Sequence, residues 1–128
     1  MSDSLQQVAI LLWSADLSAP HRVATPFVMA QAAAALDQQV EIYFTAQTVQ
    51  LLTPRVASVE VGYGPQQRLL GAYLKDAYEL GVRFYACSQA LYAAGLTRHD
   101  LVPECGGMGG AVQFMERAAD PAWRTLVF

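Results

Sequence analysis

The 128-residue chain has a formal net charge of -3, with 54% hydrophobic and only 15% charged residues. This length predicts a single domain over residues 1–128. No basic stripe is present, so we expect no nucleic-acid partner. Soluble domains usually carry about 25% charged residues, so the low charge content predicts that other subunits cover part of the surface.

No apolar segment reaches the roughly 20 residues needed to span a bilayer, so we expect no membrane association. The first apolar run, residues 8–13, is short and follows no basic residue, which argues against a signal peptide. These features predict a cytoplasmic protein. In that compartment Cys87 and Cys105 are expected to be free thiols.

The first half of the chain alternates short apolar runs with helical patterns. Residues 8–13 (VAILLW) predict a strand buried on both faces. A polar turn over residues 14–21 leads to an alanine-rich helix over residues 23–36. Residues 39–45 (QVEIYFT) predict a second strand, and residues 47–52 predict a short helix.

The middle of the chain is less regular. Residues 55–65 contain glycine and proline, and we expect at most a short extra strand at residues 58–61. Residues 67–80 then place apolar side chains at helical spacing, which predicts a helix that ends at Gly81.

The last third of the chain returns to the strand–helix pattern. Residues 82–86 (VRFYA) predict a third strand, followed by a helix over residues 88–94. Residues 96–104 form a connection with one turn of helix from Arg98. A last helix over residues 110–119 and a last strand over residues 124–128 complete the pattern.

This alternation predicts an α/β fold, with parallel strands and crossover helices on both faces of the sheet. In such sheets the functional groups gather at the carboxyl ends of the strands. The rule selects residues 14–21, residues 45–48 and the pair Cys87 and Ser88. The glycine-rich residues 105–110 precede the last helix and are expected near the same edge.

Cys87 is the candidate nucleophile, because it lies where a strand passes into a helix. The first turn of a helix offers unpaired N–H groups and the positive end of the dipole. Both favour the thiolate, which is the reactive form of cysteine. Ser88 opens this helix and is a candidate auxiliary residue. The alternative is that Cys87 is a buried, inert side chain, since cysteine is often buried.

Cys105 begins the glycine-rich segment Cys105-Gly106-Gly107-Met108-Gly109-Gly110. Glycines allow a backbone to approach a ligand closely, so Gly106 and Gly107 are candidate ligand-binding residues. Cys105 is then a second thiol that exchanges sulfur with Cys87. The simpler interpretation is a flexible loop that happens to carry a cysteine.

Three charged or titratable residues follow the first strand. His21 is a candidate to carry a proton or to lower the pKa of a thiol. Asp16 and Arg22 are candidate ligand-binding residues, and Arg22 suits an anion. All three are equally compatible with an exposed surface. No paired spacing of cysteines or histidines is present, so we expect no metal site and no cofactor.

Several segments resemble one known family in their order along the chain. A short apolar strand leads into a polar loop and an alanine-rich helix, and the combination around Gly81 and Cys87 is the most specific part. The order is similar to that of the DsrE/DsrF-like (DsrEFH) family of small sulfur-handling proteins, over nearly the whole chain. The segments that carry the resemblance are residues 9–12, 40–45, 77–88, 95–96, 100–102 and 109–111.

The resemblance implies a three-layer α/β/α fold with a five-stranded parallel sheet, assembled as a homotrimer or homohexamer. It implies that a cysteine at the position of Cys87 carries a persulfide. In the sulfur-relay members that cysteine accepts sulfur from a donor protein and passes it to a small carrier protein. Cys105 is not part of the pattern that carries over.

Three functions are compatible with these features. The first is a sulfur-relay protein that works through Cys87. Whether it is also a sulfurtransferase enzyme stays open. The second is a non-catalytic assembly or regulatory subunit in which Cys87 is inert. The third is a small-ligand or nucleotide-binding protein with a pocket between subunits, formed by residues 14–21 and 105–110.

Overall fold

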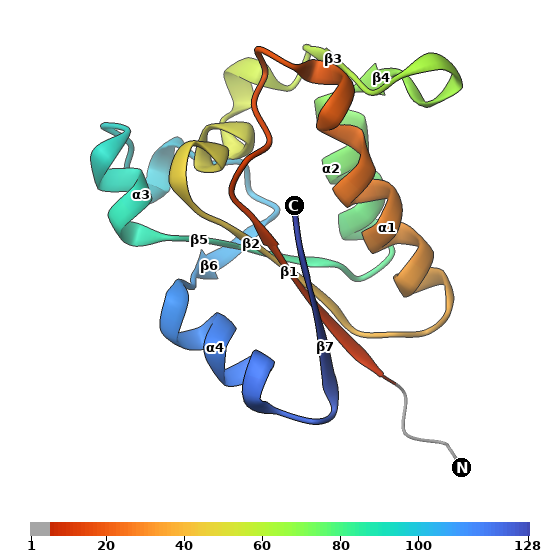
Figure 1. The fold of residues 1–128 in the computed structure, drawn as a ribbon. Coiled ribbons are helices and arrows are strands. Elements are labelled where there is room, and N and C mark those ends of the chain that lie inside the picture. Colours follow the sequence, from red (N-terminus) through yellow and green to blue (C-terminus); the bar gives the residue numbers. More distant parts are fainter. Residues whose placement is uncertain (1–5) are drawn as a thin grey trace.

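The computed structural model describes residues 6–128, and its centre is one parallel sheet. The strand order is β6-β5-β2-β1-β7, and every neighbouring pair is parallel (Figure 1). The expected five-stranded parallel sheet is therefore confirmed. The strands are β1 (Gln7–Leu12), β2 (Val40–Phe44), β5 (Arg83–Ala86), β6 (Cys105–Met108) and β7 (Trp123–Val127).

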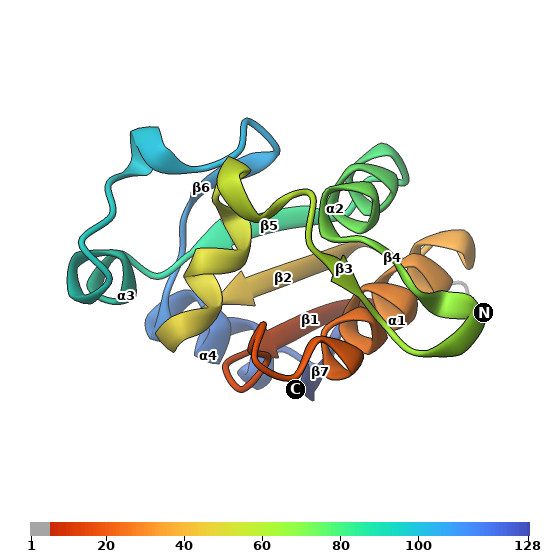
Figure 2. The ribbon, with the colours of Figure 1, turned by 90° about the horizontal axis from the view of Figure 1, so that it is seen from above.

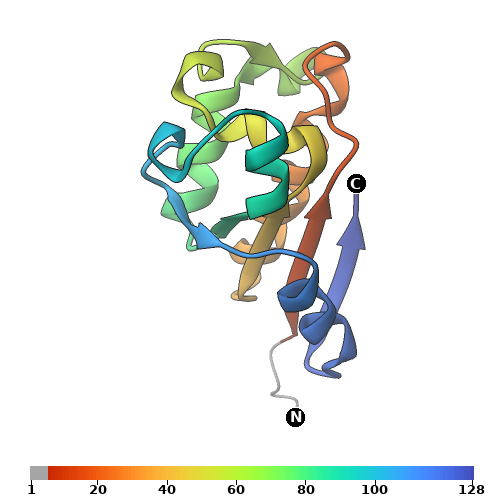
Figure 3. The same cartoon turned by 90° about the vertical axis from the view of Figure 1, so that its left-hand side faces the viewer.

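Helices cover both faces of the sheet, which confirms the three-layer α/β/α fold. Two helices, α1 and α2, lie side by side on one face, and α4 lies on the other (Figures 1 and 3). A further helix, α3, follows β5 directly and packs beside the 3₁₀ helix η2. The α-helices are α1 (Ala24–Ala35), α2 (Leu70–Glu79), α3 (Ser88–Ala93) and α4 (Ala111–Ala119). The 3₁₀ helices are η1 (Pro20–Arg22), η2 (Ala46–Leu52), η3 (Pro54–Val56), η4 (Gly64–Gln66) and η5 (Arg98–Asp100).

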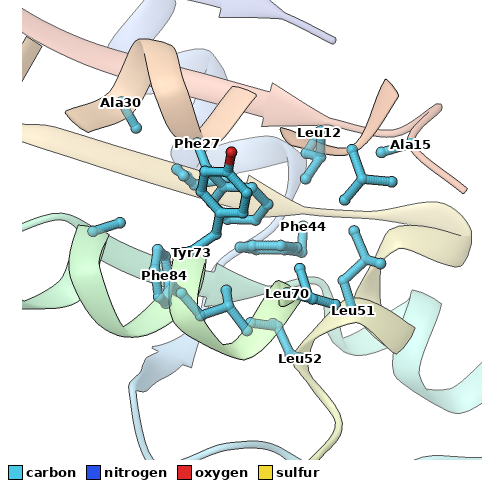
Figure 4. Packing of buried hydrophobic residues seen from close by; sticks show 14 of the residues in the cluster. Leu12, Ala15, Phe27, Ala30, Phe44, Leu51, Leu52, Leu70, Tyr73 and Phe84 are labelled. Atoms are coloured by element: carbon cyan, nitrogen blue, oxygen red, sulfur yellow. The ribbon is translucent and has the colours of Figure 1, made fainter. Parts of the chain in front are cut away.

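The face under α1 and α2 holds the main hydrophobic core (Figure 4). Side chains alternate between the two faces of a strand, and Val40, Ile42 and Phe44 of β2 all point to this side. Phe27 of α1 packs against Phe44 and against Tyr73 of α2, with ring centroids 6.3 and 6.2 Å apart. These contacts fix both helices on the sheet.

The opposite face has a much smaller apolar cluster. It consists of Ala9, Tyr43, Phe114 and Trp123, with Leu11 and Tyr85 packed against it. Phe114 is the only residue of α4 that is buried. This helix therefore rests on few apolar contacts, and polar side chains supply the rest of its attachment.

The fifth strand of the sheet is where the sequence-based expectation was wrong. Residues 105–110 were expected to form a loop, but Cys105–Met108 is β6, which pairs with β5 at the edge of the sheet. A strand of Cys-Gly-Gly-Met has too few side chains to give an alternating pattern. Its register also shifts between Phe84 and Tyr85, so even the pairing is irregular.

A small hairpin replaces the expected start of the second long helix. Two short strands, β3 (Glu60–Val61) and β4 (Arg68–Leu69), pair in antiparallel fashion above the tops of α1 and α2 (Figures 1 and 2). Gly62 has a φ of +103°, and a Cβ there would lie 2.5 Å from the Gln66 carbonyl oxygen. The turn therefore requires glycine, and α2 begins only at Leu70.

Among the described residues 6–128, no helix is both long and apolar enough to cross a membrane.

Candidate functional site

A cavity of about 580 Å³ opens at the carboxyl edge of the sheet, between β5 and α4. Cys87 lies in its wall, with Ser88 next to it. Thr45, from the segment after β2, also lines it, so two of the expected strand ends do meet here. The lining residues are Leu11, Tyr43, Thr45, Cys87, Ser88, Gln89, Gly109, Gly110, Ala111, Val112, Phe114 and Met115.

The backbone of Cys87 is fixed by hydrogen bonds on both sides. Its N–H donates to the Phe44 carbonyl over 2.9 Å, and this hydrogen bond continues the pairing of β5 with β2. Its carbonyl accepts from the Leu91 N–H over 3.0 Å, and this is the first hydrogen bond of α3. Cys87 is the extended N-cap residue of that helix, with φ −73° and ψ 122°. The strand-to-helix transition thus directs a half-buried thiol toward α4 rather than into the main core.

The chain approaches Cys87 closely through two glycines before α4. Gly109 is buried, and a Cβ there would lie 3.0 Å from the Tyr85 Cβ and 3.2 Å from a ring carbon of Tyr43. At Gly110 a Cβ would have only an ordinary contact, 3.8 Å from the Cys87 Sγ. Gly109 therefore lets β6 lead into α4 without a clash, and α4 can form one wall of the cavity.

A partly buried ion pair holds α4 to the sheet. Glu41 of β2 is 2% exposed, and its two carboxylate oxygens accept hydrogen bonds from Arg117 of α4 over 3.0 and 3.1 Å. The Arg117 guanidinium also lies 4.3 Å from the centre of the Trp123 ring. This two-point pairing gives the helix an orientation that Phe114 alone does not fix.

Tyr43 connects this ion pair to the cavity. Its hydroxyl donates to Glu41 over 2.6 Å and accepts from the Gln113 side-chain amide over 2.9 Å. Its ring stacks on Tyr85 at 5.3 Å and meets Phe114 edge-on at 5.6 Å. Tyr43 is thus held firmly in the cavity wall.

The titration behaviour of this network keeps the wall uncharged. Burial, with the hydrogen bond to Glu41, raises the pKa of Tyr43 to about 12, so the phenol is protonated at neutral pH. The hydrogen bond to Glu41 raises the pKa of Arg117 above its usual value, so the guanidinium keeps its charge beside the carboxylate. The charges on Glu41 and Arg117 therefore offset each other behind the cavity.

Cys105 lies on the other side of the sheet. It pairs with Phe84 and packs against the main core, where burial raises the pKa of its thiol. Cys87 is three residues beyond Phe84, which at about 3.3 Å per residue is roughly 10 Å along the strand. A disulfide needs Cα atoms within about 7 Å. The two cysteines of one chain therefore do not meet.

The remaining predicted site residues also lie apart from Cys87. His21 and Arg22 are exposed on η1, which is tied to the β3 hairpin by the Gly62 N–H donating to the Pro20 carbonyl over 2.9 Å. Asp16 borders a separate small hollow with Gln47 and Gln50.

Gly106 and Gly107 belong to β6, and a Cβ at Gly106 would lie 3.4 Å from the Phe84 carbonyl oxygen. Ser88 is thus the one predicted auxiliary residue that shares the cavity with Cys87 within residues 6–128.

The polar network was missed from the sequence, although one signal was available. Glu41 interrupts the otherwise apolar strand Val40–Phe44, and a buried carboxylate needs a cation. Nothing in the sequence identified Arg117 as that partner. In the part of the chain that the structure describes, no group of three or more histidine, cysteine or acidic side chains is placed to hold a metal ion.

Comparisons with known proteins agree with this architecture. A protein of unknown function from Methanobacterium thermoautotrophicum, MTH1491, is similar at 23% identity over 96% of this chain and 99% of that one, with a TM-score of 0.68. The ychN protein from E. coli is similar at 16% identity over the same shares, 96% and 99%, with a TM-score of 0.67. At such identities the likeness shows the fold alone.

Two sequence comparisons complete the assignment. No curated protein matches the chain. The model of the DsrE/DsrF-like family matches residues 7–128, which is nearly the whole sequence. The resemblance noted from the sequence is confirmed, and the chain belongs to the DsrE/DsrF-like family.

Proposed function

We propose that the protein is a sulfur-relay protein that carries a persulfide on Cys87. The observation that carries this proposal is the position of the Cys87 thiol, which lines a cavity of about 580 Å³ at the carboxyl edge of the sheet. Functional groups of open α/β sheets gather at this edge. Membership of the DsrE/DsrF-like family supports the choice of sulfur as the cargo.

The chemistry consists of two thiol exchanges. The Cys87 thiolate attacks the outer sulfur of a donor persulfide; a new S–S bond forms on Cys87, and the old S–S bond breaks with its electron pair on the donor thiolate. An acceptor thiolate then attacks the outer sulfur on Cys87 and takes it, which restores the Cys87 thiolate. No net oxidation occurs, and exchange of this kind depends on access and on the thiolate fraction.

The cavity wall limits how Cys87 is activated. Of the residues between 6 and 128 that line the cavity, none is Asp, Glu, Lys, Arg or His, so none of these side chains is suited to accept the thiol proton at neutral pH. The proton therefore leaves to water or to the partner. Access for a partner thiol is provided by the cavity, since Cys87 is half-buried rather than sealed in the core.

Assembly into a homotrimer or homohexamer belongs to the same proposal. The low charge content of 15% supports it, because a surface short of charged side chains suits contact with other subunits. Light scattering on the purified protein measures the mass directly. A mass of three or six chains is expected, and a monomer would remove this part of the proposal.

Intact-mass spectrometry tests the function. The reduced protein is incubated with a persulfide donor, and we expect wild type to gain one sulfur atom and Cys87→Ser to gain none. Equal loading of both proteins, or of neither, would contradict the proposal. Circular dichroism of Cys87→Ser is the control for folding.

A further inference from the structure

Over the part of the chain that the structure describes, the wall of the Cys87 cavity is formed by uncharged side chains. Its apolar part comes from α4 and β1, through Val112, Phe114, Met115 and Leu11. Its polar part comes from hydroxyl and amide groups, of which Thr45, Ser88 and Gln89 are neutral at every physiological pH. A nucleophile in this cavity therefore meets its reaction partner beside a largely apolar and uncharged wall.

The charges nearest to this wall neutralise each other. Glu41 lies behind Tyr43 and is paired through both oxygens with Arg117. Tyr43, with its pKa raised to about 12, presents a protonated phenol. Glu116 does not line the cavity; it borders an adjoining open hollow that shares Val112 and Met115 with the cavity rim. Within residues 6–128, no charged side chain therefore lines the cavity itself.

We propose that the cavity discriminates against charge: apart from the reacting sulfur itself, the group that brings sulfur to Cys87, or takes it away, is uncharged and apolar around its sulfur atom. This inference rests on the proposed function and names the substrate class of that site. Bringing a charged group into such a wall costs hydration that no side chain replaces. Neutral persulfides and thiols enter, and persulfides with carboxylates or ammonium groups near the sulfur are disfavoured.

The size of the cavity matches this role. Small-molecule sites usually enclose about 300–1,000 Å³ and combine apolar walls with a few polar groups, and this cavity encloses about 580 Å³. Val112 and Met115 form its outer rim, with exposed fractions of 78% and 61%. The rim is therefore a place where single charges can be introduced without disturbing the core.

Alkylthiosulfonates measure the discrimination without any sulfur transfer. The Cys87 thiolate attacks the sulfenyl sulfur of the reagent, a mixed disulfide forms, and methanesulfinate leaves with the electron pair. Three reagents of similar size are compared: neutral 3,3-dimethylbutyl, anionic sulfonatoethyl and cationic trimethylammonioethyl methanethiosulfonate. Peptide mass spectrometry follows Cys87, and each rate is divided by the rate with the same protein unfolded in denaturant.

Both charged reagents are expected to be at least about tenfold slower than the neutral one after this correction. Slower reaction of both charged reagents is the diagnostic result. The net charge of -3 alone would slow the anionic reagent and speed the cationic one. Equal corrected rates for the three reagents, or opposite effects for the two charges, would overturn the proposal.

Rim variants provide the matched test. Val112→Lys and Met115→Lys are expected to raise the corrected rate of the anionic reagent severalfold and to lower that of the cationic one. Leu36→Lys is the control, since Leu36 is 69% exposed, follows α1 at the opposite edge of the sheet and changes the net charge equally. Light scattering checks that the assembly is unchanged. A response of Leu36→Lys equal to that of the rim variants would assign the effect to overall charge and overturn the proposal.

The neutral group can belong to a small molecule or to a protein segment, and a second carrier separates these sources. The charge series is repeated with short peptides that bear a central cysteine as a pyridyl disulfide, flanked by alanine or by glutamate. If charge slows only the thiosulfonates, the natural sulfur carrier is a small molecule. If charge slows the peptides more strongly than the thiosulfonates, the natural carrier is a protein segment. If charge slows neither the thiosulfonates nor the peptides, the proposal is overturned. Since no persulfide is used, the proposed function can fail in its own test while this result stands, and the reverse also holds.

Discussion

The two faces of the sheet are built on different principles. Under α1 and α2, fully buried side chains such as Phe27, Phe44 and Phe84 interlock over most of the sheet. Under α4, a small aromatic cluster is joined to the helix by the Glu41–Arg117 ion pair, and a cavity remains beside Cys87. The first face is closely packed, and the second is packed less closely and leaves the half-buried Cys87 thiol in the wall of a cavity.

The difference predicts that substitutions on the two faces have separable effects. On the α1/α2 face they reduce the free energy of unfolding and leave the cavity chemistry unchanged in the folded fraction. On the α4 face they reduce stability less, because fewer contacts are lost, but they move a wall of the cavity. Stability and Cys87 reactivity should therefore be measured on every variant.

The largest expected effect is on the main core. Phe27→Ala removes a side chain with 0% exposure and its contacts with two other rings, and we expect a loss of about 3–5 kcal/mol in the free energy of unfolding. Chemical denaturation measures it. Met29→Ala, on the exposed side of the same helix, is the control and should change stability by about 0.5 kcal/mol or less. Similar losses for both variants would contradict the packing described for this face.

The next effect comes from the partly buried ion pair Glu41–Arg117. Arg117→Met leaves the Glu41 carboxylate buried without a cation, and we expect a loss of about 2–3 kcal/mol, reduced from the fully buried case because Arg117 is 31% exposed. The exposed pair Arg68–Asp76 offers a matched control with side chains 42% and 41% exposed, and Arg68→Met should cost under about 1 kcal/mol.

The double variant Glu41→Gln, Arg117→Met should cost less stability than the sum of the losses of its two single variants. Additive losses would show that the pair does not act as a unit.

A smaller effect is expected from the close approach at Gly109. Gly109→Ala places a methyl group 3.0 Å from the Tyr85 Cβ, which must displace β6 or α4, and we expect a loss of about 1–3 kcal/mol with a changed alkylation rate at Cys87. Gly110→Ala is the neighbouring control, since its methyl group has an ordinary 3.8 Å contact with the Cys87 Sγ. Equal stability of the two variants would mean that Gly109 is not a close-packed position.

The smallest effect is a pH dependence from Tyr43. Its pKa is raised from 10.0 to about 12 in the folded protein. A raised pKa stabilises the fold below the unfolded value, so this contribution is complete below pH 10 and is lost as the pH rises through about 12. Unfolding free energies across this interval should fall more steeply for wild type than for Tyr43→Phe. Parallel curves would indicate that the Tyr43 hydroxyl is not held by Glu41.

Much of the fold could be predicted because its signals are local. The continuous apolar run around Ile10 and the helical spacing of Leu70, Tyr73, Leu74 and Ala77 both reflect burial that repeats along one element. The position of Cys87 followed from the rule that parallel strands end at one edge. What the sequence could not provide was β6, because its two glycines carry no side chains to alternate.

The environment of Cys87 depends on contacts between distant residues. Glu41 and Arg117 are separated by 76 positions, and Tyr43 and Gln113 by 70. Their pairing depends on the way α4 crosses the sheet, which no short pattern encodes. The same holds for Cys105, whose segment was expected near the edge that carries Cys87 and which the register of β6 places beside Phe84.

One measurement tests the central claim most directly. The protein is loaded with a persulfide donor, freed of the donor and mixed with an acceptor thiol, and peptide mass spectrometry locates the extra sulfur before and after. We predict that the sulfur is on Cys87 before mixing and on the acceptor afterwards, and that Cys105→Ser behaves as wild type because Cys105 packs against the main core. Sulfur found on Cys105, or retained on Cys87 after mixing, would contradict a relay through the α4 face.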